Sequence, residues 1–233
     1  RDGCLQDVHW CYGIGGGWMH AKLALVVVLV GYHHACGALL RHYWQPAALV
    51  DEFDPRLDPR MATRALKPVR LLGQDLVLFR DASGRFGLLD RPCPHRGADL
   101  AYARHEGDGI RCPFHGWKFD VHGTCLETPA EPEGRELCAH GRQRAYPVQV
   151  RAGIVWAWLG PEGSTPAALP AFDCFAAPAT HVFAFKGLWQ CNWLQAVEIG
   201  IDPAHTSFLH RVLEDEPLDA AYGRQFRGAS AGS

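Results

Sequence analysis

The chain has 233 residues, 48% of them apolar, and its 23 basic and 25 acidic residues give a formal net charge of -2. This composition indicates a globular protein of one or two domains, and without a basic stripe we expect no nucleic-acid partner. The nine cysteines form an odd number without a repeating framework, which favours a reducing compartment. We therefore expect a cytoplasmic protein with no membrane partner.

Residues 1–37 differ in composition from the rest of the chain. A glycine-rich run at Gly13–Gly17 precedes the apolar run Leu23–Val30, which is too short to span a bilayer. A signal peptide beginning at Met19 is one interpretation, but no small-residue cleavage site follows clearly. We expect instead a poorly structured N-terminal extension over 1–37, either genuine or translated out of context.

From Leu39 onward the pattern becomes regular and predicts an α+β protein. Residues 39–46 predict a short helix that ends at Pro46. Short apolar runs separated by turn residues then predict antiparallel strands, with a hairpin turn at Asp81–Gly84. The expected strands lie at 71–72, 76–79, 86–89, 118–119, 124–126, 146–151 and 154–159. This pattern predicts a small antiparallel β domain over 38–162, a linker over 163–170 and a second domain from 171.

Two connections of the predicted β domain combine cysteine with histidine. They are C-P-H-R-G-A at Cys93–Ala98 and C-P-F-H-G-W at Cys112–Trp117, with the overall spacing C-x-H-x16-C-x2-H. Two thiolates on one iron and two imidazoles on the other would hold a Rieske 2Fe-2S cluster. Tetrahedral zinc is the alternative, although zinc-finger spacings pair two cysteines and then two histidines. The four candidate ligands are Cys93, His95, Cys112 and His115.

The prolines and glycines of these two connections fit tight loops in which backbone amides approach the sulfurs. The residues concerned are Pro94, Gly97, Pro113 and Gly116. By contrast, the segment Glu131–Arg135 has the composition of a solvated loop.

The stretch 192–210 has a second metal-site composition. It places Glu198, Asp202, His205 and His210 within thirteen positions, and two imidazoles with a carboxylate suit a ferrous ion. Helical geometry would put the first three on one face, whereas His210 requires a break in the helix. The Asp202-Pro203 step supplies one, because proline restricts the residue before it away from α geometry. A solvent-facing polar helix is the alternative interpretation.

From about Gly37 to its end, the chain resembles the oxygenase α subunit of Rieske non-heme iron ring-hydroxylating oxygenases. The opening L-L-R-H-Y-W-Q-P is similar to the phthalate 4,5-dioxygenase branch, and both family motifs occur in order. Respiratory Rieske proteins carry a second cysteine in each loop and join them by a disulfide, but these two loops have none. The low-potential oxygenase type therefore fits better.

The resemblance implies specific ligands. Cys93 and Cys112 would hold one cluster iron, and His95 and His115 the other. In the pattern E-x3-D-x2-H-x4-H, His205 and His210 would hold a mononuclear Fe(II), with Glu198 and Asp202 as the acidic positions. The family's third iron ligand is an aspartate far downstream. We therefore expect an N-terminal fragment that contains only the beginning of a helix/sheet catalytic domain.

The resemblance also implies a function, namely that of the terminal oxygenase of a multicomponent system. Electrons from NAD(P)H would pass through a separate flavin/iron-sulfur reductase to the cluster and then to the mononuclear iron. There O2 would be activated and an aromatic substrate hydroxylated. In the family's trimers an acidic residue, here Asp202, joins the cluster of one subunit to the iron of the next.

Two alternatives to a dioxygenase remain open. One is a Rieske ferredoxin that only carries electrons, and residues 198–210 speak against it because a carrier has no use for a second iron site. The other is a monooxygenase or O-demethylase of the same family, which would use the same ligands.

Overall fold

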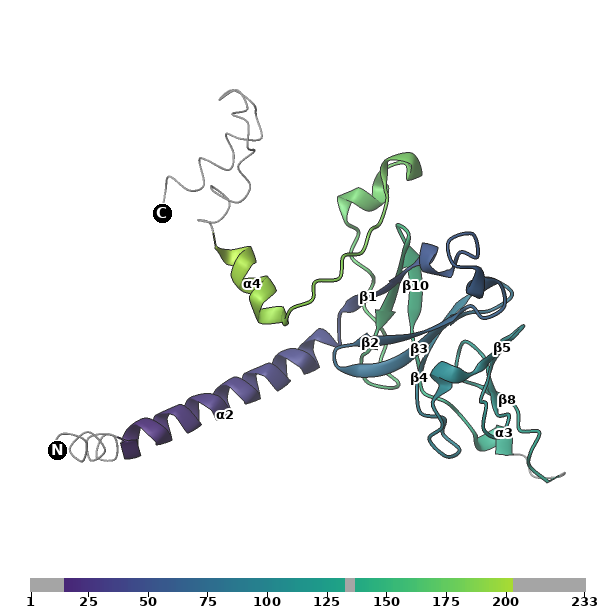
Figure 1. The fold of residues 1–233 in the computed structure, drawn as a ribbon, viewed down its shortest axis with the longest axis horizontal. Helices are drawn as coiled ribbons and strands as arrows, with labels where there is room; N and C mark the ends of the chain where they lie inside the picture. Colours follow the sequence, from purple (N-terminus) through teal and green to yellow (C-terminus); the bar gives the residue numbers. More distant parts are fainter. Residues whose placement is uncertain (1–14, 133–136, 203–233) are drawn as a thin grey trace, which may run out of the picture. The chain divides into compact units, whose positions relative to one another are not determined.

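The computed structural model describes residues 15–132 and 137–202. Contacts between residues divide the chain into two compact units, Arg1–Phe185 and Lys186–Ser233. The first unit contains helix α2 (Gly15–Leu40), helix α3 (Leu137–His140) and the strands, and the second contains helix α4 (Trp193–Ile201) (Figure 1). Short 3-10 helices lie at Val50–Phe53, Pro59–Ala62, Leu100–Tyr102, Asp173–Ala176 and Ala179–His181.

Three antiparallel sheets form the body of the first unit. The first has the order β1-β11-β10, the second β2-β3-β4-β9 and the third β5-β6-β7-β8. Their strands are β1 (Trp44–Leu49), β2 (Leu66–Leu71), β3 (Gln74–Arg80), β4 (Phe86–Asp90), β5 (Arg104–Glu106), β6 (Gly109–Arg111), β7 (Lys118–Phe119), β8 (Cys125–Glu127), β9 (Ala145–Tyr146), β10 (Val148–Arg151) and β11 (Ile154–Trp158). The antiparallel β domain expected from the sequence is confirmed.

The second sheet lies between two hydrophobic cores, as its central place in Figure 1 suggests. Successive side chains of a strand point to opposite faces, and β3 divides accordingly. Val77 and Phe79 join the core shared with the third sheet, whereas Leu76 and Leu78 join the core shared with the first. All four side chains are fully buried. This two-sided burial explains why residues 76–79 form an uninterrupted apolar run.

The turn predicted at Asp81–Gly84 joins β3 to β4. The Asp81 carboxylate accepts hydrogen bonds from the Ser83 hydroxyl at 2.7 Å and from the Arg85 amide at 2.8 Å. Gly84 has a φ of 86°, a left-handed conformation that favours glycine. The pairs Arg80–Phe86 and Phe79–Gly87 follow from this turn and set the register of the two strands.

The helix predicted over 39–46 is wrong. Helix α2 ends at Leu40, and residues Trp44–Leu49 form β1, which pairs antiparallel with β11. Pro46 lies inside this strand, where the register shifts between Pro46 and Ala48. Proline lacks an amide donor and is tolerated at such irregularities. Pairing with a strand more than a hundred residues away therefore outweighs the local pattern.

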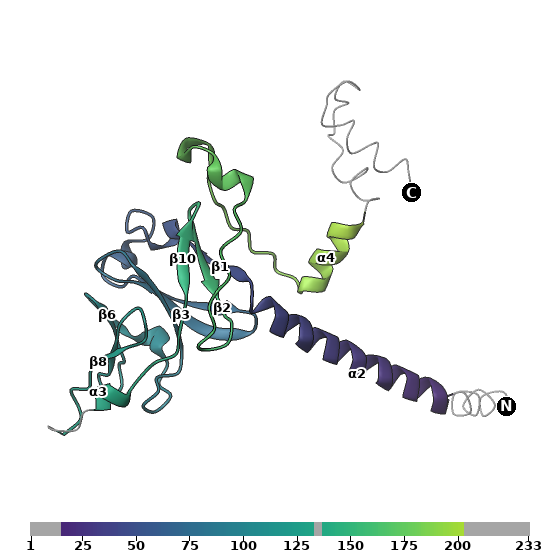
Figure 2. The same cartoon turned by 180° about the vertical axis from the view of Figure 1, so that it is seen from behind.

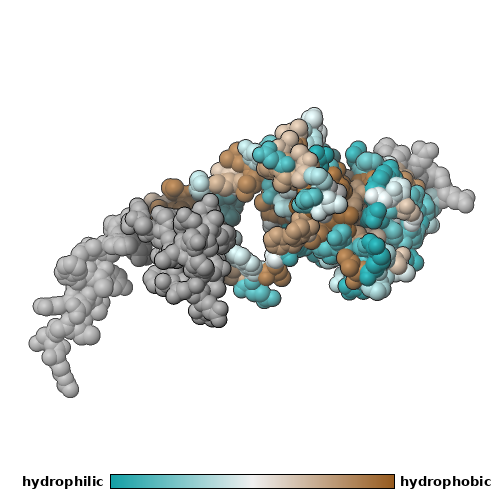
Figure 3. Space-filling view, turned by 90° about the horizontal axis from the view of Figure 1, so that it is seen from above, coloured by the Kyte–Doolittle hydropathy of each residue, from teal (hydrophilic) through white to brown (hydrophobic). Residues whose placement is uncertain are grey.

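Residues 1–37, expected to be poorly structured, include most of α2. An apolar stretch without proline favours a helix here, while residues 1–14 lie outside the described residues. The apolar residues 25–30 of α2 are widely exposed, from 50% at Val30 to 68% at Val27. Hydrophobic residues, brown in Figure 3, interleave with hydrophilic ones on the face shown there. Within the described ranges, no helix is long and apolar enough to cross a membrane.

The segment expected to be a linker, 163–170, contacts the β domain. The Trp44 indole donates a hydrogen bond to the Ala167 carbonyl at 2.7 Å. Further along, the Phe175 ring lies edge-on to Trp156, with ring centroids 6.2 Å apart. The first compact unit accordingly extends to Phe185. The limits of the functional domains remain a prediction.

Candidate metal centre

The two cysteine-histidine loops have the same construction. In the first, the Cys93 amide donates to the Ala98 carbonyl and the Gly97 amide to the Cys93 carbonyl, both at 2.8 Å. In the second, the Cys112 amide donates to the Trp117 carbonyl at 2.8 Å and the Gly116 amide to the Cys112 carbonyl at 3.2 Å. The tight loops predicted from the sequence are present, and each repeats the other's hydrogen bonds.

Each loop turns at a glycine in the left-handed region, with a φ of 70° at Gly97 and 77° at Gly116. A side chain at Gly97 would meet nothing within 4 Å, whereas one at Gly116 would approach Pro129 Cγ to 2.8 Å. The second loop is therefore constrained both by its backbone conformation and by packing.

The two thiols lie together in the hydrophobic core. Cys93 and Cys112 are 3% and 2% exposed and belong to one buried cluster of side chains. Burial and, to a lesser degree, the adjacent Cys112 thiol raise the pKa of the Cys93 thiol to about 11, despite hydrogen bonds from the His95 and Arg96 amides. A buried thiolate is costly without a positive partner, so these two thiols suit a metal that binds and neutralises them.

The two imidazoles lie closer to the surface than the thiols. The rings of His95 and His115 have centroids 4.6 Å apart at an angle of 73°, and both residues are half-buried. The Trp117 ring stacks on His95, with centroids 5.0 Å apart and an interplanar angle of 2°. The indole Nε1 of Trp117 is buried and has no hydrogen-bond partner among the described residues. This stacking fixes the plane of the His95 ring.

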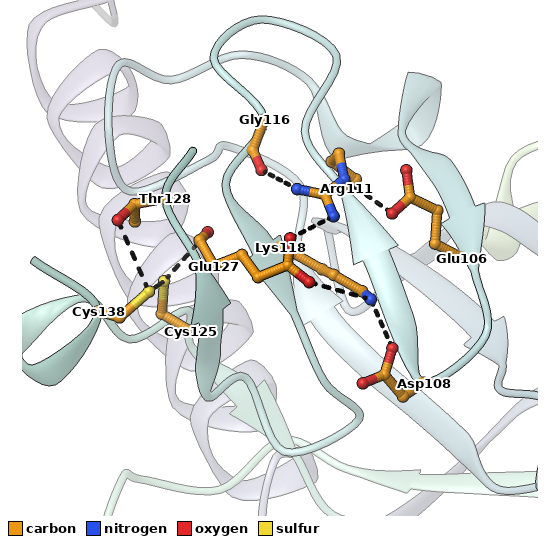
Figure 4. Close-up of polar contacts among 9 residues, drawn as sticks. All are labelled: Glu106, Asp108, Arg111, Gly116, Lys118, Cys125, Glu127, Thr128 and Cys138. Atoms are coloured by element: carbon orange, nitrogen blue, oxygen red, sulfur yellow. Dashed lines mark hydrogen bonds and ion pairs between the residues drawn. The ribbon is translucent and has the colours of Figure 1, made fainter. Parts of the chain in front are cut away.

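Arg111 supports the second loop, and the sequence analysis missed it. Its guanidinium donates to the Gly116 carbonyl at 2.8 Å, to Glu106 at 2.7 Å and to Glu127 at 2.6 Å. Figure 4 shows the guanidinium between the loop and these two carboxylates. Hydrogen bonding to Glu127 and Glu106 raises the pKa of Arg111. The charge is thus held in place, and the loop carbonyl is fixed beside the position of His115.

The first loop has a corresponding pair in Arg91 and Asp99. Arg91 Nε donates to Asp99 Oδ1 at 3.0 Å, and the Leu100 amide donates to the Arg91 carbonyl at 2.8 Å. The hydrogen bond from Arg91 lowers the pKa of Asp99. A basic residue one or two positions before each cysteine was the available sequence signal for both supports.

Glu131 corrects the expectation of a solvated loop at 131–135. Its side chain is 17% exposed, and its Oε1 lies 3.8 Å from Nε2 of His95. Residues 133–136 lie outside the described residues. No motif in the sequence indicated this contact, because 35 residues separate Glu131 from His95 and only the fold brings the two side chains together.

The donor set fits a two-iron cluster. Each loop contributes one thiol and one imidazole, and one iron of a Rieske cluster takes two thiolates while the other takes two imidazoles. In a two-iron cluster each iron needs only two protein ligands, because the bridging sulfides supply its other ligands.

The second candidate site is described only in part. Helix α4 begins after Asn192, whose side chain accepts a hydrogen bond from the Gln195 amide at 3.1 Å. Glu198 lies within the helix, and Asp202 follows its end with extended angles of φ -83° and ψ 107°, as expected before proline. Both side chains are exposed. His205 and His210 lie outside the described residues, so their predicted role stays a prediction.

The fold and the donor set define an iron–sulfur domain of the Rieske type. Residues 44–148 match the family model described as the Rieske [2Fe-2S] domain. The chain is 42% identical over 185 residues to the 5,5'-dehydrodivanillate O-demethylase oxygenase subunit of Sphingobium, covering 78% of this chain and 41% of that protein. It is 40% identical over 177 residues to the phthalate 4,5-dioxygenase oxygenase subunit of Pseudomonas putida, covering 75% and 38%.

The structure agrees with these matches. A crystal structure of dicamba monooxygenase with non-heme iron and dicamba superposes with a TM-score of 0.50 at 29% identity, covering 60% of this chain and 40% of that one. The chain belongs to the Rieske oxygenases, as a relative of their oxygenase subunits. It spans about two fifths of the length of these two curated relatives.

Proposed function

We propose that the chain carries the cluster domain and the beginning of the catalytic domain of a terminal oxygenase that hydroxylates an aromatic substrate. The observation that carries the proposal is the pair of equivalent loops, each of which brings one thiol and one imidazole to the same place. Strands β5 and β6 lie between the two loops in the chain, and the third sheet and its core hold the loops together.

In this proposal Cys93 and Cys112 hold one iron, and His95 and His115 hold the other. The burial of the thiols and the more exposed position of the imidazoles support this division. When bound, the cluster accepts one electron at a time, at a potential raised by its neutral imidazoles. Trp117 keeps the His95 ring in plane, and the half-exposed imidazole edges are the accessible side for electron exchange.

His205 and His210 would bind the mononuclear Fe(II), with Glu198 and Asp202 as the neighbouring acidic residues. Their order and spacing support this assignment. The similarity of the chain to the oxygenase subunits of an O-demethylase and a dioxygenase is consistent with a second iron site. A third ligand, an aspartate, would come from the longer protein.

The reaction would consume O2 and electrons that a flavin/iron-sulfur reductase draws from NAD(P)H. Phthalate and dehydrodivanillate, the compounds for which these two relatives are named, are aromatic, which supports an aromatic acid or ether as substrate. The demethylase and the dioxygenase are 42% and 40% identical to the chain, so similarity does not separate O-demethylation from dioxygenation. A homotrimer and a cytoplasmic location complete the proposal.

An electron carrier is the second candidate, because the two loops alone would serve a Rieske ferredoxin equally well. The residues beyond 148 favour the oxygenase, since the O-demethylase and dioxygenase subunits match there as well. Turnover of an aromatic acid by the longer protein with a reductase would establish the oxygenase, whereas cluster reduction without any oxygen consumption would favour the carrier.

Electron paramagnetic resonance of the reduced, iron-loaded chain tests the cluster itself. We expect the spectrum of a mixed-ligand 2Fe-2S centre, which Cys112→Ser should abolish. Cys174→Ser is the matched control, because this cysteine is exposed and belongs to neither loop, and the spectrum should survive. Bound zinc without iron in the parent chain would overturn the assignment.

A further inference from the structure

A second pair of thiols faces each other beside the cluster loops. Cys125 begins β8 and Cys138 lies in α3, and their sulfurs are 2.7 Å apart. Figure 4 shows the two sulfurs pointing toward one another between the strand and the helix, and Figure 2 shows α3 beside β8 from behind. Neither cysteine belongs to the cysteine-histidine loops, and the proposed function makes no use of them.

We propose that Cys125 and Cys138 are a redox-active dithiol that hydrogen peroxide converts into a disulfide while the cluster ligands stay unchanged. A disulfide bond measures about 2.05 Å, so the sulfurs need only a small side-chain movement to form it. The facing elements already hold the two residues together, since both pack against one hydrophobic core. This inference concerns the Rieske domain and is independent of the mononuclear iron.

The difference in exposure between the two thiols sets the order of the reaction. Cys138 is half-buried and is the side chain that peroxide reaches, whereas Cys125 is 6% exposed. The Cys138 sulfur attacks one oxygen of the peroxide and the O–O bond breaks. Cys138 becomes a sulfenic acid, and the other oxygen leaves as water. The Cys125 sulfur then attacks the Cys138 sulfur, the S–S bond forms, and a second water leaves. Two thiols lose two electrons and one peroxide becomes two waters.

The disulfide would hold the segment that covers His95. Between the two cysteines lie Glu131, which faces the His95 ring, and Pro129, which packs against Gly116. Just after α3, Gly141 lies so close to Trp117 that an added Cβ would approach its ring to 2.8 Å. A bond between Cys125 and Cys138 restricts how far Pro129 and Glu131 can move away from the cluster loops. We therefore expect the oxidised chain to retain its cluster longer than the reduced chain.

Peptide mapping of the cluster-loaded chain tests the bond directly. Trypsin places Cys125 in peptide 119–135 and Cys138 in peptide 136–142, whereas Cys93 and Cys112 fall in peptides 86–96 and 112–118. After treatment with peroxide and alkylation, we expect peptides 119–135 and 136–142 to be linked in most chains. A dithiol reductant should break the link, so that both peptides are then recovered separately with alkylated cysteines.

The matched variants are Cys138→Ser, which should give no linked pair, and Cys174→Ser, which should behave like the parent because Cys174 is exposed elsewhere. Recovery of both parental peptides alkylated, or linkage to the peptides of Cys93 or Cys112, would overturn the proposal. The linked peptides of the parent chain decide the test, so the test remains valid even if a variant fails to fold.

Cluster retention is the second measurement. After peroxide is removed with catalase, an iron chelator should bleach the oxidised parent severalfold more slowly than the reduced parent. In Cys138→Ser the same two treatments should give equal rates. Equal rates in the parent as well would show that the bond does not hold the segment over His95, and that part of the inference would fail.

Discussion

The cluster loops and the stretch 192–210 both have the composition of a metal site, and the structure describes the first in full and the second only as far as Asp202. The loops bring four donors together from positions 93–95 and 112–115, with the thiols buried and the imidazole centroids 4.6 Å apart. Glu198 and Asp202, by contrast, lie on one short helix and at its end, and both side chains are exposed.

The cluster loops show what a metal site requires besides suitable residues. Strand pairing in the third sheet and a shared core position the two loops, and Arg111 and Trp117 fix the loop backbone and a ligand ring. A local helix supplies spacing alone. Rigid support of this kind keeps ligands oriented. The cluster loops have it within the described residues, whereas the two candidate histidine ligands of the stretch 192–210 lie outside those residues.

The largest expected effect separates the two regions by their cluster content. Cys93→Ser removes a buried ligand and should abolish the bound cluster, because a metal site of this kind depends on every thiolate. Glu198→Gln and Asp202→Asn should leave cluster content at the parental level. Iron and sulfide per chain, together with the visible absorbance, are the measurements. Loss of the cluster in either variant of the second pair would contradict this division.

In the longer protein, Asp202→Asn should slow turnover and cluster reoxidation by about 10- to 100-fold, the range for residues that orient metal ligands. The amide keeps the size of the side chain but removes the charge that strengthens its hydrogen bonds. Iron content should stay near normal, which distinguishes a role in electron passage from one in metal binding. Reoxidation at the parental rate, measured with substrate and oxygen present, would instead point to Glu198.

The support of the second loop is tested by Arg111→Met. Its guanidinium is 14% exposed, and its removal leaves the Gly116 carbonyl and two partly exposed carboxylates without this donor. We expect a loss of about 1–2 kcal/mol in the free energy of unfolding. Arg56→Met is the control, since its side chain is 87% exposed beside Asp54 and such pairs contribute little. Denaturant titration measures the unfolding midpoints of the two variants. Equal midpoints would show that Arg111 does not stabilise the second loop.

Alanine at the two loop glycines compares the loops with each other. Gly97→Ala should cost about 1 kcal/mol, the penalty of a left-handed residue with a side chain. Gly116→Ala should cost more, because its Cβ would also meet Pro129 at 2.8 Å. Thermal unfolding of the two variants measures the difference. A larger effect at Gly97 would mean that the packing of the second loop is looser than described.

The smallest effect concerns Asp81 in the hairpin turn, outside both regions. Burial alone would raise the pKa of its carboxyl, but hydrogen bonds from Ser83 and Arg85 outweigh burial and lower the pKa. A lowered pKa in the folded state stabilises the protein above about pH 4, the unfolded value, and this contribution is lost as the pH falls further. The unfolding midpoint of Asp81→Asn should therefore depend less on pH in this range than that of the parent.

The sequence by itself determined the β domain and the identity of its metal-binding loops. Short apolar runs and turn residues located strands such as 76–79 and 86–89, because burial on the faces of a sheet leaves a pattern in neighbouring positions. The spacing of Cys93, His95, Cys112 and His115 indicated the cluster, because each loop keeps its thiol and imidazole within four residues. Asp202 was also expected to be extended, because Pro203 restricts it locally.

Tertiary structure alone decided the features that depend on distant partners. Trp44–Leu49 became a strand because β11 pairs with it, against a local pattern that predicts a helix. Glu131 lies beside His95, and Cys125 faces Cys138, only because strands and loops pack against one another. No periodicity or motif records such contacts, because they arise from where the chain folds back on itself and not from the order of neighbouring residues.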